Sequence, residues 1–216
     1  LYVPSGSQGN QIAVRLQTQP GEEVAVGEAS HSFDWEMAAL AALSGVQARI
    51  LPTTRGRIDQ NAAGGALHPA GGFRPACRLL VVENTHNFHG GAVVPLDHLQ
   101  ALTETAEERG ARVHLDGARL WNAAVATRTP LAAYGEIADT IMVCLSKGLA
   151  APVGSILIGD ADLIARARDV RTMFGGGMRQ VGVLAAPGLV AVREMRDRLA
   201  EDHARARRLG EAFAAH

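Results

Sequence analysis

The sequence predicts an α/β domain with a doubly wound, mostly parallel sheet and helices on both of its faces. Short apolar segments alternate with helical patterns of about 10 to 15 residues, which is typical of βαβ units. The segment 78–83 is a continuous apolar run, as expected for a strand covered on both faces. The chain has 216 residues, 47% hydrophobic and 20% charged, which suits one folded domain with its own core.

The first half of the chain begins with a turn at 4–7 and then alternates helix and strand. Pro20 and Gly21 stand side by side and break the first helix. The segment 59–77 is rich in Gly, Ala and Pro and is predicted to be a loop. The elements predicted before this loop are a helix at 8–18, a strand at 23–26, a helix at 34–43 and a strand at 47–51.

The second half repeats the pattern with longer helices. An amphipathic helix is closed by Gly110, a residue type that commonly caps helix C-termini. The predicted strands are 78–83, 111–116, 140–145 and 153–158. The predicted helices are 97–109, 160–172 and, after a Gly triplet at 175–177, a long helix at 180–213.

Composition excludes several classes of function. The 21 basic and 22 acidic residues give a formal net charge of −1, which offers no basic field to nucleic acid or to an anionic membrane. Aromatic residues make up only 4%, too few for a base-stacking platform, and no apolar run reaches the ~18 residues of a membrane span. Cys77 and Cys144 belong to no metal-ligand spacing, and so few cysteines favour a reducing cytosol.

Parallel α/β sheets bind ligands beyond the carboxyl ends of their strands, and four such ends here carry unusual polar groups. The segment 4–7 leads into a helix whose free N–H groups can hold a phosphate. Asp116 closes one strand and Arg119 opens the next helix, so both can face one cavity. Lys147 directly follows a buried strand, where partial desolvation makes an amine a better nucleophile. The segment 83–87 is rich in hydrogen-bond acceptors.

Taken singly, these motifs have ordinary interpretations: a Ser-Gly turn, a surface ion pair or cap, a solvated lysine, and a turn held by side-chain-to-backbone bonds. Taken together they fit one chemistry. A Schiff-base lysine, an aspartate for a pyridinium nitrogen and a phosphate cup are the parts that hold pyridoxal phosphate. Gly6, Asp116 and Lys147 follow one another at intervals of 110 and 31 residues, in the order found in large pyridoxal-phosphate enzymes with a doubly wound domain.

These motifs closely resemble those of the low-specificity L-threonine aldolases, in the aromatic amino acid β-eliminating lyase/threonine aldolase group of fold type I. The resemblance covers nearly the whole chain and is weakest at 52–77. The matching motifs are PSGS at 4–7, ENTHN at 83–87, HLDGAR at 114–119, CLSKGL at 144–149 and GGGMRQ at 175–180.

The resemblance implies a role for each matching residue. Lys147 forms the Schiff base with pyridoxal phosphate, Asp116 pairs with the pyridine nitrogen, and Arg119 lies near the 3-hydroxyl of the cofactor. His31 matches the imidazole that stacks on the cofactor ring, although by itself it resembles a cap or a surface residue.

The phosphate contacts implied by the resemblance are Gly6 and Ser7, with Ser146 as a further contact. The family's phosphate loop often reads SGTMAN, where this chain has SGSQGN. Ser7 keeps the hydroxyl, whereas Gly9 is expected to weaken the helix start by up to about 1 kcal/mol relative to Ala.

The implied reaction is the retro-aldol cleavage of a β-hydroxy-α-amino acid, L-threonine or L-allo-threonine, to glycine and an aldehyde. The base that takes the hydroxyl proton is His31, His68 or an ordered water. His68 is near the place of a second active-site histidine in the family, although 69–73 resembles an insertion after it. Arg179 is a candidate contact to substrate or to a neighbouring subunit, or else a surface cation.

Relative to the family, the chain lacks an N-terminal arm and a C-terminal small domain. We therefore expect residues 1–216 to form a cofactor-binding large domain, with 180–216 leading towards the small domain. Family members are usually tetramers, so we expect a homo-oligomer, either a dimer or a tetramer.

Other functions stay open at this stage. One is a β-eliminating lyase or another fold type I enzyme, and another is an inactive truncated paralogue. A metal site at His114 and Asp116, which share one strand face, lacks a third ligand at a useful spacing, so no metal is expected.

Overall fold

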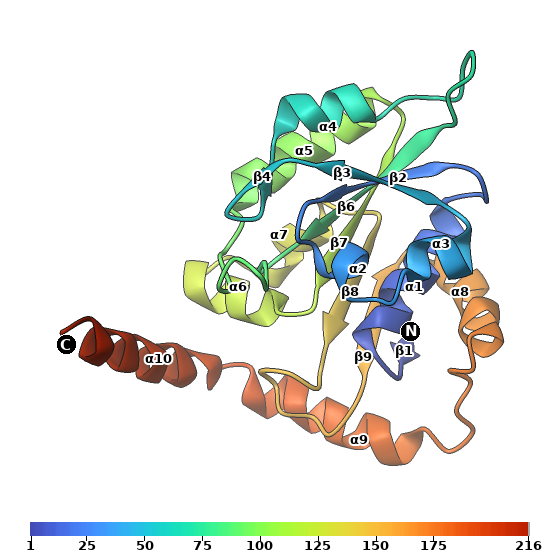
Figure 1. Ribbon diagram of the computed structural model, residues 1–216. Helices are drawn as coiled ribbons and strands as arrows, with labels where there is room; N and C mark the ends of the chain where they lie inside the picture. Colours follow the sequence, from blue (N-terminus) through green and yellow to red (C-terminus); the bar gives the residue numbers. More distant parts are fainter. Residues whose placement is uncertain (216) are drawn as a thin grey trace.

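A seven-stranded sheet forms the centre of the computed structural model, which describes residues 1–215 (Figure 1). The strands of this sheet are β1 (Tyr2–Val3), β2 (Glu23–Gly27), β3 (Gln47–Leu51), β6 (Cys77–Glu83), β7 (Arg112–Gly117), β8 (Thr140–Cys144) and β9 (Ser155–Gly159), and a separate hairpin pairs β4 (Thr53–Thr54) with β5 (Arg57–Ile58). The spatial order is β1-β9-β8-β7-β6-β2-β3. The five strands from β8 to β3 are mutually parallel, and antiparallel pairing is confined to β9 and its two neighbours. The predicted mostly parallel sheet is therefore confirmed.

Helices cover both faces of the sheet (Figure 1). On one side, α1, α3 and α8 pack on the sheet, and on the other side α4 to α7 do so. The helical elements are α1 (Gly6–Gln17), α2 (His31–Asp34), α3 (Ala39–Ser44), α4 (Gln60–Ala66), α5 (Leu96–Glu108), α6 (Leu120–Thr127), α7 (Leu131–Gly135), α8 (Ala161–Met173), α9 (Gly182–Val190), the π-helical turn η1 (Ala191–Met195) and α10 (Leu199–Ala214).

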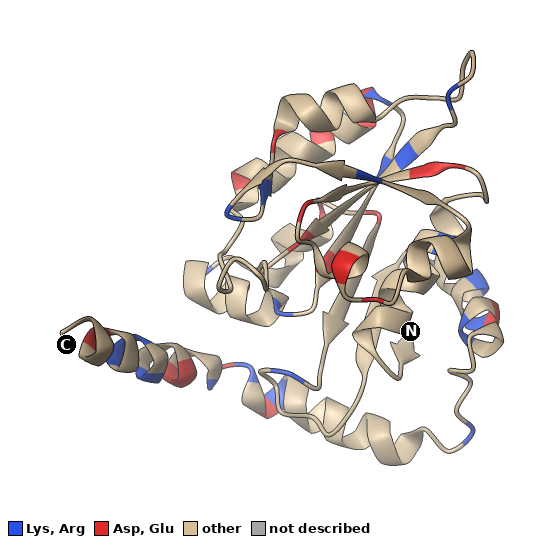
Figure 2. Ribbon diagram, in the orientation of Figure 1, with Lys and Arg blue, Asp and Glu red and all other residues tan. Residues whose placement is uncertain are grey.

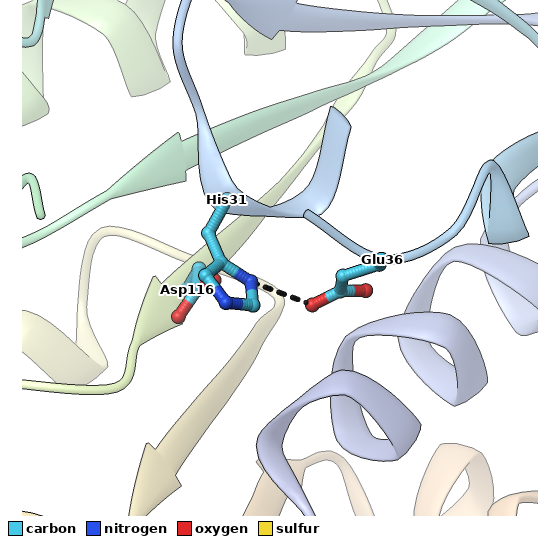
Figure 3. Close-up of side chains that lie close together, drawn as sticks. All are labelled: His31, Glu36 and Asp116. Atoms are coloured by element: carbon cyan, nitrogen blue, oxygen red, sulfur yellow. Dashed lines mark hydrogen bonds and ion pairs between the residues drawn. The ribbon is translucent and has the colours of Figure 1, made fainter. Parts of the chain in front are cut away.

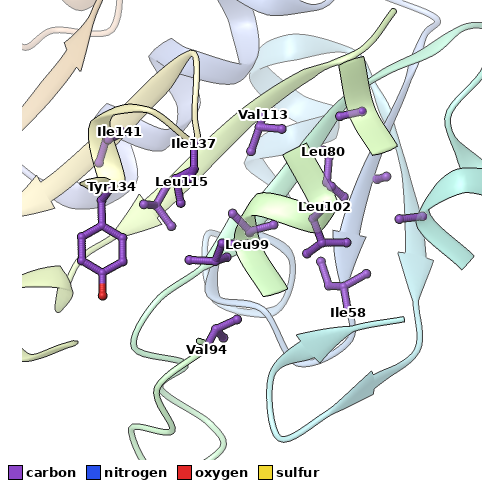
Figure 4. Packing of buried hydrophobic residues seen from close by; sticks show 14 of the residues in the cluster. Ile58, Leu80, Val94, Leu99, Leu102, Val113, Leu115, Tyr134, Ile137 and Ile141 are labelled. Atoms are coloured by element: carbon purple, nitrogen blue, oxygen red, sulfur yellow. The ribbon is translucent and has the colours of Figure 1, made fainter. Parts of the chain in front are cut away.

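Strand β6 explains why the sequence of a central strand is a continuous apolar run. Leu80 and Val82 pack into the core cluster with α5 (Figure 4), while Leu79 and Val81 pack into the cluster on the opposite face. All four side chains are buried, with at most 4% exposed. Because successive strand residues point to opposite faces, a strand covered on both faces needs an apolar side chain at every position.

Helices α8 and α10 each carry several charged residues (Figure 2). The helix α9 between them contains none. Within residues 1–215, no helix combines the length and the hydropathy that a bilayer span requires.

Helix α1 approaches the sheet closely at Gly9. Ser5 caps the helix, since its Oγ accepts the N–H of Gln8 at 3.2 Å. A Cβ atom placed on Gly9 would lie 2.6 Å from Cγ of Met142 in β8. The glycine lowers helix propensity, as the sequence indicates, but it also lets the start of α1 rest against the sheet.

Two predicted segments differ from the structure. The helix predicted at 34–43 is instead the two short helices α2 and α3, separated at Met37 and Ala38, whose φ angles are 55° and 56°. Non-glycine residues rarely adopt this left-handed conformation, and no pattern in the sequence predicts a break at these two residues. The loop predicted at 59–77 contains α4, which Asp59 caps by accepting the N–H of Ala62 at 2.8 Å.

Other differences concern the helices that follow β7 and the end of the chain. Helix α6 begins directly after Arg119, as predicted, whereas α7 was not predicted, and the two fill the connection between β7 and β8. The helix predicted at 180–213 is divided into α9, η1 and α10, with a turn at 196–198. Strands β4 and β5 were not predicted either. The other elements with a predicted range agree with it to within about two residues, a common difference at element ends.

We expect Gly9→Ala to destabilise the protein by about 1–3 kcal/mol, because the added methyl group overlaps Met142. Its matched control is Gly65→Ala in α4, where nothing lies within 4 Å of the new Cβ. That change is expected to stabilise by up to about 1 kcal/mol through helix propensity. Urea denaturation of both variants measures the difference, and equal effects at the two positions would contradict the close approach of α1.

Candidate active site

Polar side chains converge at the carboxyl ends of β2, β6, β7 and β8. Asp116 lies near the end of β7 and pairs in register with Glu83, the last residue of β6. His31 follows β2 as the first residue of α2, and Lys147 follows β8. The structure therefore brings Asp116, Glu83 and Lys147, which the strand-end rule selected, to the same edge as His31, which the resemblance selected.

Asp116 is one of three buried acids in the site, with Glu36 and Glu83. It is 2% exposed, its Oδ2 accepts a hydrogen bond from Nδ2 of Asn10 at 2.8 Å, and its Oδ1 accepts the N–H of Ala118 at 3.0 Å. Burial raises the pKa of Asp116, and the nearby Glu36 raises it further. Among the described residues, no basic side chain forms an ion pair with Asp116, so a cationic N–H donor would complete its surroundings.

His31 lies beside Asp116 and is held by Glu36, as Figure 3 shows. Nδ1 of His31 lies 3.1 Å from Oε1 of Glu36, whose side chain is 1% exposed. This hydrogen bond is the main cause that raises the pKa of His31, with burial acting in the opposite direction. The bond directs Nδ1 towards Glu36 and leaves Nε2 as the free nitrogen of the imidazole.

His31, Glu36 and Asp116 offer three ligand atoms within 4.8 Å of one another, a cluster that resembles a metal site. The amide of Asn10 argues against a metal, because its Nδ2 donates to Oε1 of Glu36 at 2.9 Å and also to Asp116. Both carboxylates are thus hydrogen-bonded to an N–H donor at the point where an ion would have to lie. The cluster is better described as a hydrogen-bonded network.

Glu83 joins the two segments that surround the site. Its Oε2 accepts the backbone N–H of His31 at 2.8 Å, and its Oε1 accepts the backbone N–H of Asn87 at 2.9 Å. Burial, followed by the charge of Asp116, raises the pKa of Glu83 to about 7. The same two segments meet again where the rings of Trp35 and Phe88 stack, with centroids 4.6 Å apart and planes 7° apart.

Lys147 is half-buried in the turn after β8, and it is the only lysine in the chain. The other 20 of the 21 basic residues are arginines. Its positive charge is close enough to act on His31, whose pKa it lowers slightly against the effect of Glu36. Ser146, beside it, is exposed, and Arg119 is half-buried at the N-cap of α6.

The start of α1 offers backbone donors. Ser5 accepts the N–H of Gln8, whereas the N–H groups of Gly6 and Ser7 belong to the first turn and have no carbonyl partner within the helix. Such N–H groups and the positive end of the helix dipole favour an anion. The helix passes beside the site, because its Asn10 contacts Asp116.

His68 is not brought to the site. Its backbone exchanges hydrogen bonds with that of Cys77, the first residue of β6, at 3.1 and 2.9 Å. Glu83 is the last residue of β6, six strand positions or about 20 Å further on. His68 therefore lies at the amino end of the sheet, where its Nε2 is 3.9 Å from Glu23, and the expectation that it serves as a base is wrong on position.

Sequence reasoning missed His86 and Glu36 as members of the site. His86 is 2% exposed, neither ring nitrogen has a partner among the described residues, and its Nε2 is 4.0 Å from Glu83. Burial, then the charge of His89, lowers its pKa to about 4. The signal for His86 was present in the acceptor-rich segment 83–87, whereas no pattern marks Glu36.

Arg179 is exposed in the segment between α8 and α9. In the described part of the chain it forms no hydrogen bond or ion pair with another side chain.

These groups fit pyridoxal phosphate. The buried Asp116 lacks a cationic partner such as a protonated ring nitrogen, Lys147 supplies a primary amine, and the start of α1 supplies N–H donors for a phosphate. The imidazole of His31 lies next to Asp116, so it can cover one face of a ring whose nitrogen binds Asp116 (Figure 3). Fold and site together define a domain of the fold type I, pyridoxal-phosphate-dependent class.

The chain belongs to the beta-eliminating lyase family, whose family model matches residues 1–216. Low-specificity L-threonine aldolase 1 of Arabidopsis thaliana is 39% identical over 217 residues, which cover 99% of this chain and 61% of the relative. The low specificity L-threonine aldolase of Escherichia coli K12 is 38% identical over 94% of this chain and 60% of the relative.

The threonine aldolase of Leishmania major has the same fold, with a TM-score of 0.87 at 22% identity, over 99% of this chain and 63% of that one. The chain thus spans about three fifths of the length of these relatives.

The pKa of Glu83 predicts a pH-dependent effect of Glu83→Gln. Between about pH 4.5 and 7 the folded protein keeps a proton on Glu83 that the unfolded chain releases, so the stability of the wild type falls as pH rises. Glutamine has no proton to release. The free energy of unfolding of the variant, relative to wild type, is therefore expected to increase across this range, by up to about 3 kcal/mol.

Urea denaturation at pH 5, 6, 7 and 8 measures this difference. Glu108→Gln, at the exposed end of α5, reports the effect of removing one surface carboxylate. A difference between wild type and Glu83→Gln that does not change with pH would contradict the raised pKa.

Proposed function

We propose that this protein binds pyridoxal phosphate and cleaves L-threonine or L-allo-threonine to glycine and acetaldehyde. The observation that carries the proposal is the convergence of Lys147, Asp116 and His31 at one end of the sheet. The named relatives support the choice of substrate, since those at 38–39% identity are low-specificity L-threonine aldolases.

In this proposal the chain binds the cofactor at four points. Lys147 forms the covalent link through its primary amine, and Asp116 accepts the N–H of the ring nitrogen. Gly6 and Ser7 bind the phosphate through their backbone N–H groups and the Ser7 hydroxyl, with Ser146 as a further contact. Arg119, at the start of α6, is placed for the 3-hydroxyl.

When bound, pyridoxal phosphate supplies an electron sink for the pair of electrons left at Cα as the Cα–Cβ bond breaks. Asp116 supports this role by keeping a negative charge beside the ring nitrogen. Because Asp116 is buried, this charge acts with little screening from water. The proton balance requires a base for the β-hydroxyl proton and a donor that returns a proton to Cα.

Two imidazoles are available for the β-hydroxyl proton. His31 presents Nε2 while Glu36 holds Nδ1, and the resulting rise in pKa makes His31 a stronger proton acceptor. His86 is the second candidate, because both of its ring nitrogens are buried without a partner among the described residues. An ordered water held by either imidazole is the third candidate for the base. His68 is no longer a candidate, because it lies at the other end of the sheet.

The assembly and the compartment are also proposals. Residues 1–216 form the cofactor-binding large domain, with α9 and α10 leading away from it (Figure 1). We propose a homo-oligomer, a dimer or a tetramer, with Arg179 as a candidate interface residue. Two buried free cysteines and no described disulfide are consistent with a reducing cytoplasm.

The cofactor proposal is tested at Lys147. With pyridoxal phosphate, the wild-type protein is expected to develop a visible absorbance band that shifts on addition of glycine. Borohydride reduction followed by peptide mapping should place the label on Lys147, the only lysine. Lys147→Arg, which keeps the charge without a primary amine, and Lys147→Ala should both lose the band.

A wild-type protein without the band would refute the cofactor proposal and favour an inactive paralogue. A band retained in Lys147→Arg would place the covalent link elsewhere.

The reaction is tested by its products. The proposed aldolase converts L-threonine to glycine and acetaldehyde, whereas a β-eliminating lyase acting on L-serine releases pyruvate and ammonia. We expect acetaldehyde without pyruvate. Replacement of the base, as His31→Gln or His86→Gln, is expected to lower kcat by about 10²- to 10⁴-fold. Pyruvate as the main product would favour the lyase, and two unimpaired variants would exclude both imidazoles as the base.

A further inference from the structure

A chain of buried hydrogen bonds leads from the sheet to Asp116. Nε2 of Gln17 is 2.8 Å from Oγ1 of Thr140, which is 2.8 Å from Nδ1 of His114. Nε2 of His114 is 3.0 Å from Oδ1 of Asn10. Nδ2 of Asn10 then donates to Asp116 at 2.8 Å and to Glu36 at 2.9 Å.

The proton positions along this series of hydrogen bonds follow from the acceptors at the end that contains Asp116 and Glu36. Carboxylate oxygens accept hydrogen bonds, so the amide nitrogen of Asn10 must face Asp116 and Glu36. The carbonyl oxygen Oδ1 therefore faces His114, whose Nε2 must carry the proton. Burial lowers the pKa of His114 to about 4, so its ring is neutral and Nδ1 accepts the hydroxyl proton of Thr140.

The direction of this chain decides the orientation of the Asn10 amide. With the amide reversed, Oδ1 would face two carboxylate oxygens, so two favourable contacts would become repulsive. Both side chains are fully enclosed, with Asn10 1% and His114 0% exposed, and water cannot replace the lost partners.

Asn10 also connects two acids of the candidate site. Asp116 is the residue for the ring nitrogen, and Glu36 holds Nδ1 of His31, the residue for the ring face. The two N–H bonds of one amide thus serve both carboxylates. A side chain of the same shape without these donors would leave two buried acids side by side, which favours a proton shared between them.

We propose that Asn10, oriented by the Nε2–H of His114, is a positioning residue that keeps Asp116 available as the anionic partner of the cofactor's ring nitrogen and links it to His31 through Glu36. This inference rests on the proposed binding of pyridoxal phosphate. The role of His114 is indirect, because it contacts Asn10 and neither of the two acids.

The first test needs no cofactor. In the ¹⁵N NMR spectrum of the wild-type chain at pH 7, His114 is expected to be neutral with its proton on Nε2 and none on Nδ1. In Asn10→Leu, Nε2 loses its acceptor, and the proton is expected to move to Nδ1, which lies 3.2 Å from the carbonyl oxygen of Thr140. A wild-type His114 that is protonated on Nδ1 alone would overturn the proposal without any variant.

The second test measures the dissociation constant for pyridoxal phosphate. Asn10→Leu is expected to weaken binding about 10- to 100-fold, because hydrogen bonds to buried charged groups are lost. His114→Phe is expected to weaken binding about tenfold. In the double variant, the His114 change should add nothing further, since it acts through Asn10. Additive effects would show that His114 and Asn10 act separately and would overturn the proposal that His114 acts through Asn10.

Thr18→Val is the matched control. Thr18 is buried at the C-cap of the same helix, and its hydroxyl donates to the carbonyl oxygen of Val14 at 2.8 Å, outside the hydrogen bonds that join His114, Asn10 and Asp116. Its loss should change neither the tautomer of His114 nor the dissociation constant. If the wild type itself fails to bind pyridoxal phosphate, the proposed function fails while the NMR result stands. If wild type and Asn10→Leu bind equally, the positioning role fails and the proposed function stands.

Discussion

The burial of the Asp116 carboxylate at the end of β7 is the constraint on which the rest of the site depends. A charge removed from water needs donors around it, and the fold supplies Asn10 from α1 and the N–H of Ala118. No cation completes the set among the described residues, which leaves a place for a cationic nitrogen. Helix α1 therefore contributes twice to the site, with its first N–H groups available to a phosphate and Asn10 bound to Asp116.

Much of this arrangement was predictable from the sequence because it follows from local rules. Apolar runs identify the strands, and the carboxyl ends of parallel strands must meet at one edge, so Asp116 and Lys147 were expected together. Those rules are silent on long-range side-chain contacts. Glu36 joins the site through a break between α2 and α3 that depends on two left-handed residues. His68 was misplaced because spacing along the chain does not reveal which end of β6 it adjoins.

The two segments carrying His31 and His86 are held as one unit. Glu83 binds the backbone of both, and Trp35 stacks on Phe88 beyond it. This arrangement sets the two imidazoles on a shared support, so a change at Glu83 reaches both of them. Burial of Glu83 beside Asp116 has an energetic cost, which its raised pKa shows. The hydrogen bonds from the backbone N–H groups of His31 and Asn87 offset part of this cost.

The single lysine has a practical consequence. In most proteins, amine-directed reagents label many surface positions, and the signal from one functional amine is lost among them. Here all other basic side chains are arginines, so a lysine-specific protease has one cleavage site within the sequence, next to Lys147. Acylation, reductive methylation or isotope labelling of lysine side chains would report on this one position. The chain thus carries its own spectroscopic and chemical probe at the point where its chemistry is expected.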